Sequence, residues 1–211
     1  MATIQSGHSP GGRAGAGVQV LEAARGVDVR PIKKRLDAFA RTHRAYAAAD
    51  AKVRRAEEAL RRQQVVVAEG DVDQNEAVDG LAASMAGEGL QRQNPFKPLG
   101  FPAPSRINDL GYGKQAQVML RLGKAAGKRK GASKATVAAA RAVEKAAQLM
   151  QRELKKVPPL EQSRRAAFAQ RDALAQPWEG AFAALKRGAR AAEDDGARGL
   201  FAALFQRPAR A

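Results

Sequence analysis

The sequence contains no cysteine, which excludes disulfide bonds, thiolate metal sites and cysteine nucleophiles. Histidine is scarce as well, since His8 and His43 are the only two in 211 residues, and this speaks against histidine-based catalysis. No run approaches the roughly 20 apolar residues of a membrane span, and the N-terminal segment lacks the apolar core of a signal peptide. We therefore expect no membrane span, and the cytoplasm is the default location.

Large apolar residues are also few. Aromatic residues make up 5% of the chain, and Leu, Ile, Val and Phe together reach about 19%, just under the usual value for well-packed globular domains. Alanine supplies about half of the apolar residues; it buries little surface but is the best helix former. The composition therefore favours long, thin, closely approaching helices over a sheet-based core.

Acidic residues are outnumbered, with 21 Asp and Glu against 37 Lys and Arg and a formal net charge of +16. Such an imbalance attracts polyanions such as nucleic acid, anionic lipid or an acidic protein. The alternative is a compositional cause, because a GC-rich genome also enriches Arg and Ala. Composition alone does not separate the two.

A heptad pattern runs from Ile32 to Val67 in steps of four and three residues. One column is apolar and consists of Ile32, Phe39, Tyr46, Val53, Leu60 and Val67. After Leu36 the other column is polar and consists of His43, Asp50, Glu57 and Gln64. A helix with this pattern packs against another helix. We expect the polar column to face solvent, with a hydrogen-bonded second interface as the alternative.

Glycine and helix-capping residues set the expected helix boundaries in the first half of the chain. Residues 1–27 are rich in Gly, Ser and Ala and are predicted to be a flexible leader, although Val18, Val20 and Leu21 could dock as a short element. The heptad helix is predicted to end at Gly70. Asp73 and Glu76 have capping-box spacing and are expected to open a second, acidic helix.

The second half repeats the heptad rhythm. Ser133 is a good N-cap for a helix whose seam consists of Thr136, Ala140, Val143, Ala147, Met150, Leu154 and Val157. Pro158 and Pro159 should end it. A further helix from Leu160 should bend or restart near Pro177, and residues 194–196 should break the chain before a last short helix. We expect these helices to fold back on each other, with Ala140 and Ala147 facing Phe39, Tyr46 and Leu60 as a guess about register.

Three segments are candidate interaction sites. Residues 94–105 carry four prolines around Phe96, Leu99 and Phe101, and either turn the chain with these side chains buried, which we favour, or dock into a partner. The last helix places Leu200, Phe201, Leu204 and Phe205 on one face with Arg198 and Arg207 flanking it, and it either caps its own bundle, which we favour, or inserts into a partner or a membrane interface.

The third candidate is the basic run at residues 123–134. Its Lys124, Lys128, Arg129, Lys130 and Lys134 lie at a helix break among glycines and could neutralise several phosphates without reading bases. The alternative is a solvated loop that balances the acidic residues Asp71, Asp73, Glu76, Asp79 and Glu88. No aromatic residue is interleaved, which argues against stacking on single strands.

Catalytic and metal-binding patterns are not found. His43, Asp50 and Glu57 are seven residues apart, about 10 Å along a helix, and so cannot converge on one metal ion. Gly123 and Gly127 each precede a lysine but lack the rest of a phosphate loop. We expect no cofactor, no metal and no enzymatic activity.

The sequence as a whole predicts an all-α, elongated antiparallel helical hairpin or coiled-coil-like bundle. Its expected parts are the leader (1–27), a bundle domain (28–196) and a short amphipathic C-terminal helix with a tail (197–211). The expected function is that of a structural or assembly protein that contacts a protein partner or itself, within a larger bacterial or viral assembly. The alternative is sequence-nonspecific nucleic-acid binding, with Arg41, Arg44, Arg54, Arg55, Arg61 and Arg62 of the first helix adding to the basic run.

Overall fold

A computed structural model describes residues 4–5 and 9–206, and every regular element in this part of the chain is a helix. The predicted all-α class is therefore confirmed. The helices form two compact units. The first comprises the described residues up to Glu57 together with those from Ser163 onward, and the second comprises Glu58–Gln162. The predicted bundle domain, 28–196, is thus divided between the two units.

Helix α2 (Lys33–Gly87) contributes residues to both units and is continuous over 55 residues. The predictions that it ends at Gly70 and that Asp73 opens a new helix are wrong. Packing explains why: a Cβ at Gly70 would lie 3.3 Å from Met150 Cε, so tertiary contact maintains the helix through a residue of low helix propensity. Val65, Val66 and Val67 are helical as well, although β-branched residues favour strands.

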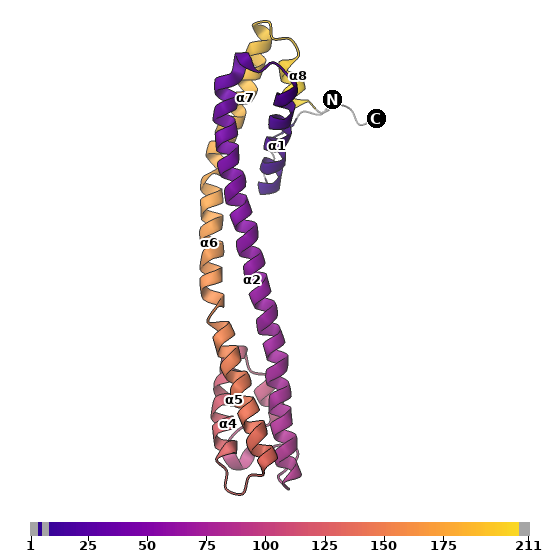
Figure 1. Cartoon of the computed structure of the whole chain (residues 1–211), viewed down its shortest axis with the longest axis vertical. Coiled ribbons are helices and arrows are strands. Elements are labelled where there is room, and N and C mark those ends of the chain that lie inside the picture. Colours follow the sequence, from indigo (N-terminus) through magenta and orange to yellow (C-terminus); the bar gives the residue numbers. More distant parts are fainter. Residues whose placement is uncertain (1–3, 6–8, 207–211) are drawn as a thin grey trace, which may run out of the picture. The chain divides into compact units, whose positions relative to one another are not determined.

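The first unit contains α1 (Pro10–Ala23), the first part of α2, the end of α6 (Val157–Ala173), α7 (Ala175–Asp194) and α8 (Leu200–Phe205), with 3-10 turns at Ala24–Gly26 and Arg30–Ile32 (Figure 1). Helix α1 lies within the segment predicted to be a flexible leader; the alternative given there, that part of the segment docks as a short element, is the one observed. The Ser9 side chain caps it by accepting a hydrogen bond from the Gly12 N–H at 3.0 Å. Val20 is buried while Val18 stays exposed, so α1 docks through one face.

Aromatic side chains dominate the core of the first unit. Trp178 and Phe182 stack with ring centroids 5.0 Å apart, and Phe39 meets Trp178 edge-on at 5.5 Å. Tyr46 lies beside Trp178, at 6.1 Å. Aromatic pairs of this kind stabilise a core beyond the area that they bury, which compensates for the scarcity of large aliphatic residues.

The second unit packs the later part of α2 against α4 (Tyr112–Gly127) and α5 (Lys134–Leu154), with a 3-10 turn at Lys97–Leu99 and the short α3 (Pro104–Asn108) completing it. As predicted, Ser133 caps α5 by accepting from the Thr136 N–H at 3.1 Å. The predicted seam positions from Thr136 to Met150 are all buried.

The predicted register is wrong. Ala140 and Ala147 belong to the core of the second unit, whereas Phe39 and Tyr46 belong to the aromatic core of the first. The small residues serve a different contact: a Cβ at Gly123 of α4 would lie 2.8 Å from the Ala140 carbonyl oxygen of α5. Small residues on both helices therefore bring α4 and α5 close together.

The remaining boundaries follow the sequence in part. Helix α5 ends at Leu154, and Pro158 and Pro159 lie in the first turn of α6, where proline is tolerated. The chain restarts at α7 two residues before Pro177. Helix α7 ends at Asp194, and Gly196 and Gly199 take positive φ angles of 103° and 78° before α8. The restart near Pro177 and the break at residues 194–196 were predicted, whereas Pro158 and Pro159 do not end α5 but lie inside α6, which begins at Val157 and not at Leu160.

Candidate interaction surfaces

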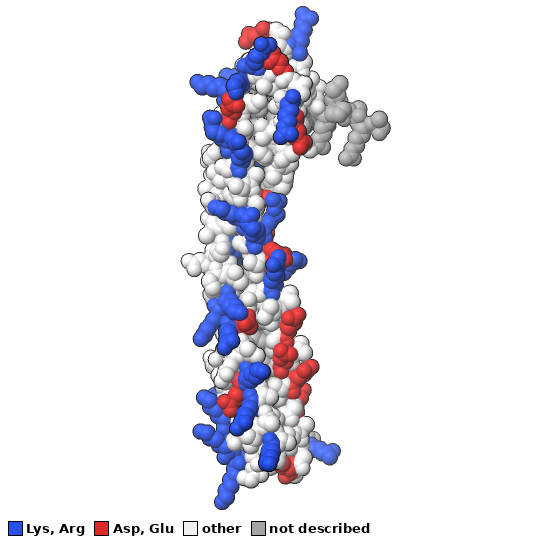
Figure 2. Space-filling view, in the orientation of Figure 1, with Lys and Arg blue, Asp and Glu red and all other residues white. Residues whose placement is uncertain are grey.

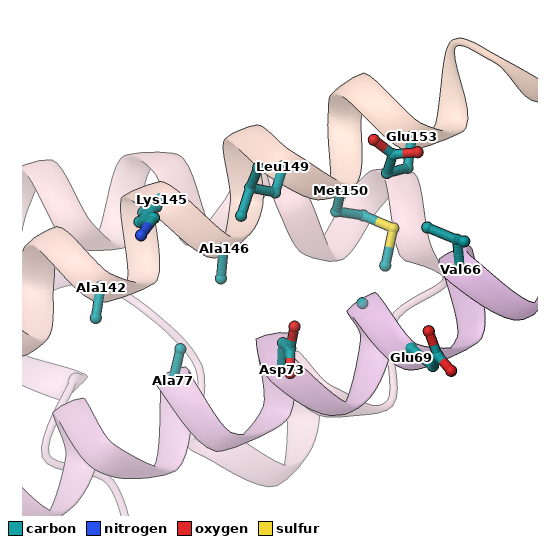
Figure 3. Close-up of a pocket in the computed structure, with 11 residues that line it drawn as sticks. Val66, Glu69, Asp73, Ala77, Ala142, Lys145, Ala146, Leu149, Met150 and Glu153 are labelled. Carbon is teal, nitrogen blue, oxygen red and sulfur yellow. The ribbon is translucent and has the colours of Figure 1, made fainter.

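An apolar groove of about 420 Å³ lies between α2 and α5 in the second unit (Figure 3). Its floor and walls are small or aliphatic and consist of Val66, Gly70, Ala77, Ala142, Ala146, Leu149 and Met150. Low-numbered residues of α2 lie opposite high-numbered residues of α5, because the two helices are antiparallel. Leu149 is 43% exposed and Val66 41%, so two large aliphatic side chains at this groove remain in contact with solvent.

The two walls of the groove differ in charge. Helix α2 contributes Glu69 and Asp73, whereas α5 contributes Lys145 and Glu153. Glu153 accepts a hydrogen bond from Gln63 Nε2 at 2.9 Å and pairs with Lys156 at 2.7 Å, and these partners lower the pKa of its carboxyl group. Among the described residues, Glu69, Asp73 and Lys145 have no ion-pair partner. Three charged groups at the groove thus have no ion-pair partner within the part of the chain that the structure describes.

The acidic wall is part of a longer acidic stretch. Between Arg62 and Arg92 the chain has six acidic residues and no Lys or Arg, in a protein whose net charge is +16. Within the second unit, Figure 2 shows acidic side chains along the side formed by α2 and basic ones over α4 and α5. The part of α2 between Arg62 and Arg92 is therefore the acidic side of this unit.

The basic run surrounds the turn between α4 and α5. Four of its five predicted phosphate-binding residues, Lys124, Lys128, Lys130 and Lys134, are exposed. Arg129 differs, because it forms an ion pair with Glu88 and its side chain is only 21% exposed. Glu88 also accepts hydrogen bonds from the Ser133 N–H and the Thr136 hydroxyl, both at 2.7 Å. Arg129 thus belongs to a polar cluster that holds the turn.

The proline-rich segment is folded into its own unit. Phe96 is fully buried in the core of the second unit, and Leu99 and Phe101 pack partly buried against that core. The Asn94 side chain accepts from the Phe96 N–H at 3.2 Å, and Gly100 takes the left-handed conformation with φ 77°. The favoured interpretation, a structured turn with buried side chains, describes this segment; Phe96 is not accessible to a partner.

The C-terminal helix is buried in the same way. Leu200, Phe201, Leu204 and Phe205 are all buried in the core of the first unit. The Phe205 carbonyl accepts a hydrogen bond from the Ile4 N–H at 2.6 Å. Helix α8 therefore caps its own unit, as favoured, and its apolar face is not free for a partner. Arg207 lies outside the described residues.

The polar heptad column does not behave as one surface. Glu57 and Gln64 are exposed as expected, but His43 and Asp50 are buried, which corrects the expectation that the whole column faces solvent. His43 accepts a hydrogen bond from Trp178 Nε1 at 3.1 Å, and burial lowers the pKa of its imidazole. Asp50 pairs with Arg54 at 3.2 Å and Arg171 at 3.9 Å. These two residues hold the first unit together.

The six arginines that were predicted to extend the basic surface lie on α2, and all are exposed, namely Arg41, Arg44, Arg54, Arg55, Arg61 and Arg62. Three of them are paired within α2, since Arg54 contacts Asp50 while Arg61 and Arg62 both contact Glu58. The guanidinium groups of Arg61 and Arg62 lower the pKa of the Glu58 carboxyl. The positive charge available on α2 is therefore smaller than the residue count suggests.

No cluster of three or more potential metal ligands occurs within residues 4–5 and 9–206. None of the helices in that part of the chain is both long enough and apolar enough to cross a membrane. His8 lies outside the described residues.

The groove is the surface that sequence reasoning missed. Val66, Leu149 and Ala146 carry no recognisable motif, and Leu149 lies off the predicted seam of α5. The signal that could have found it is the run of acidic residues with Val65, Val66 and Val72 beside it.

Comparison with protein families, curated proteins and solved structures gives no match.

Proposed function

We propose that the chain is a non-enzymatic assembly protein that acts through helix-to-helix contacts at the α2–α5 groove. The observation that carries this proposal is the groove itself, with exposed Val66 and Leu149 lining it. Around it lie Glu69, Asp73 and Lys145, which have no ion-pair partner among the described residues. Val65 and Val72 of α2 are also exposed, at 53% and 55%. An apolar strip between charged edges is the usual form of a groove that binds a helix.

The other two apolar segments that could bind a partner are buried, and this favours the groove as the site of contact. The side chains of the proline-rich segment and of α8 are used inside the protein, so they offer little to a partner. Of the large apolar residues that are exposed within residues 4–5 and 9–206, four lie on α2 and α5, namely Val65, Val66, Val72 and Leu149, and two of these, Val66 and Leu149, line the groove. The groove is therefore the surface best suited to a protein contact.

Site-specific photo-crosslinking tests the proposal. A photoreactive amino acid replaces Leu149, 43% exposed, in the chain expressed in its own cells, and a matched control replaces Tyr112, 42% exposed on α4. We expect a crosslinked product heavier than the 22.4 kDa chain from position 149 and much less from position 112. Equal crosslinking at both positions, or none at either, would contradict the proposal.

A second candidate function is nonspecific binding to nucleic acid. Its support is the group of four exposed lysines, Lys124, Lys128, Lys130 and Lys134, around one turn. Changing these four to Gln while keeping Arg129, which pairs with Glu88, separates phosphate binding from stability. Fluorescence anisotropy with duplex DNA across a salt series should then show affinity that falls log-linearly with salt and a shallower slope in the variant. An identical slope in both proteins would show that these four lysines do not bind phosphates, and the positive charge of the chain would then be a matter of composition.

A further inference from the structure

We infer that the outward faces of α4 and α5 bind the phosphate backbones of duplex nucleic acid. The inference rests on the second candidate function and extends it from one turn to two complete helices. The residues concerned are basic, exposed and without an ion-pair partner among the described residues. We call them the basic face, and they are Lys114, Arg121, Lys124 and Lys128 on α4 and its C-cap, and Lys134, Arg141, Lys145 and Arg152 on α5.

Helical periodicity arranges the basic face in two rows. On α5 the four residues are spaced by seven, four and seven positions, so they lie within about 40° of one another around the helix. On α4 the spacing of seven, three and four positions places the other four within about 80°. Each row lies opposite the buried side of its helix, which includes Met119 and Leu122 on α4 and Ala140 and Val143 on α5. The two rows therefore face away from the core of the second unit.

Acidic side chains do not interrupt the rows. Residues 111–152 include ten Lys and Arg but a single acidic residue, Glu144. Glu144 faces α4, because a Cβ at Gly123 would lie 2.5 Å from its Cγ. Glu153, the other acidic residue of α5, accepts a hydrogen bond from Gln63 of α2. Both carboxylates thus contact neighbouring helices, and the positive charge over α4 and α5 reaches solvent (Figure 2).

The dimensions of the basic face match those of a duplex. The row on α5 spans 18 residues, from 134 to 152, or about 27 Å. The α4 row lies on the adjacent helix, which approaches α5 closely at Gly123 and Ala140. A duplex carries one phosphate per about 1.7 Å of its axis, so a stretch of the same length offers about 16 phosphates. Two rows of four cations on rigid helices can therefore contact about six of them at once.

Other polyanions fit this surface less well. Single strands are held by stacking on aromatic side chains, and Tyr112, the only aromatic residue of the two helices, begins α4 outside its row. A helix that lies on an anionic membrane inserts an apolar side among the lipids, whereas the apolar sides of α4 and α5 are buried in the core of the second unit. A duplex backbone requires only exposed cations, so it is the ligand that these observations favour.

Fluorescence anisotropy with duplex DNA of two unrelated sequences tests the inference. About six phosphate contacts should weaken wild-type binding about 10³-fold between 50 and 200 mM salt, equally for both sequences. The helix variant combines Lys114→Gln, Arg121→Gln, Arg141→Gln and Arg152→Gln, and it keeps the turn and Lys145 of the groove intact. With about four contacts fewer, its affinity should fall only about tenfold over the same salt range.

A matched control removes the same charge elsewhere. It combines Arg41→Gln, Arg44→Gln, Arg55→Gln and Arg165→Gln, which change four exposed arginines of the first unit that have no ion-pair partner within the described chain. Circular dichroism should show both variants folded, because Gln is a good helix former and no ion pair is lost. The control should keep the salt dependence of the wild type.

The outcomes separate this inference from the proposed functions. If the variant of the four turn lysines loses salt dependence but the helix variant does not, binding is confined to the turn; the inference then fails and the second candidate function stands. Absence of duplex binding would remove both. Equal losses in the helix variant and the control would attribute binding to net charge and overturn the inference.

Vesicles test the membrane as an alternative ligand. Binding to vesicles of phosphatidylcholine and phosphatidylserine in equal parts should be weaker than binding to duplex DNA. Tighter binding to the vesicles that the helix variant loses would assign the basic face to a membrane and overturn the inference. None of these results alters the crosslinking expected at position 149, because the helix variant leaves the residues of the groove unchanged.

Discussion

Trp178 donates a hydrogen bond from Nε1 to Nδ1 of His43 across 3.1 Å, and both side chains are buried. The acceptor nitrogen must be unprotonated, so this bond exists only with the neutral imidazole. Helix α1 closes over the same ring: a Cβ at Gly17 would lie 2.1 Å from His43 Nδ1. One histidine thus links α1, α2 and α7, and the stability of the first unit depends on its protonation state.

The first prediction concerns pH. Burial lowers the pKa of His43 below its value in the unfolded chain, which is near 6.5. The stabilisation is therefore fully present above pH 6.5 and is lost as pH falls towards the folded pKa, because the unfolded chain binds the proton more tightly. The free energy of unfolding should decrease as pH falls below 6.5, by at most about 1.4 kcal/mol per pH unit.

Urea unfolding followed by fluorescence measures this effect, because Trp178 is the only tryptophan and lies in the first unit. His43→Gln is the matched variant: its side-chain oxygen can accept from Trp178 but does not titrate in this range. We expect the pH dependence between 7 and 5 to flatten in His43→Gln. An unchanged slope would assign the acid sensitivity to another group.

The second prediction concerns the contact between α1 and His43. Gly17→Ala should lower the free energy of unfolding by about 1 to 3 kcal/mol, because the added methyl group forces the buried ring or the helix to move. Gly15→Ala is the control on the same helix, since nothing lies within 4 Å of its Cβ position. It should instead stabilise α1 by about 0.5 to 1 kcal/mol. The test is a urea titration read by Trp178 fluorescence; a similar sign for both variants would contradict the described packing.

The third prediction concerns the close approach of α4 and α5. A Cβ at Gly123 would lie 2.5 Å from Glu144 Cγ and 2.8 Å from the Ala140 carbonyl oxygen. The backbone contact cannot relax by a rotamer change, so Gly123→Ala should cost about 2 kcal/mol or more. Gly80→Ala in α2, with nothing within 4 Å, should be neutral or stabilising. Thermal unfolding by circular dichroism compares the two, and equal melting temperatures would argue against the tight crossing.

The fourth prediction concerns the turn between α4 and α5. Arg129→Gln should lower the free energy of unfolding by about 1 to 2 kcal/mol, because it leaves Glu88 without its ion-pair partner beside Ser133 and Thr136. Lys130→Gln, at the exposed neighbour, should change it by less than about 0.5 kcal/mol. Urea unfolding by circular dichroism measures both. Equal effects would show that the cluster does not hold the turn.

Local sequence features determined much of the secondary structure. The capping spacing at Ser133 and the break at Gly196 both act within a few residues, so their consequences can be derived without knowing the fold. The same holds for the buried heptad positions of α5, because a 3.5-residue period fixes which side of a helix is apolar.

The expectations that failed all depend on what lies across from a residue. Gly70 does not end a helix because Met150 packs on it, and His43 is not on the surface because Trp178 and α1 cover it. The pattern of one helix specifies that it has an apolar side but not which helix covers that side, so the register of Ala140 could not be derived.

The sequence by itself thus determined an all-α chain, the N-cap of α5 at Ser133 and its basic character, because these follow from local propensity and composition. Only the tertiary structure decided that Phe96 and Phe205 are core residues, that Arg129 is structural, and that Val66 and Leu149 border an open groove. The physical reason is that burial and charge pairing are properties of two surfaces in contact, and those contacts join residues far apart in the chain.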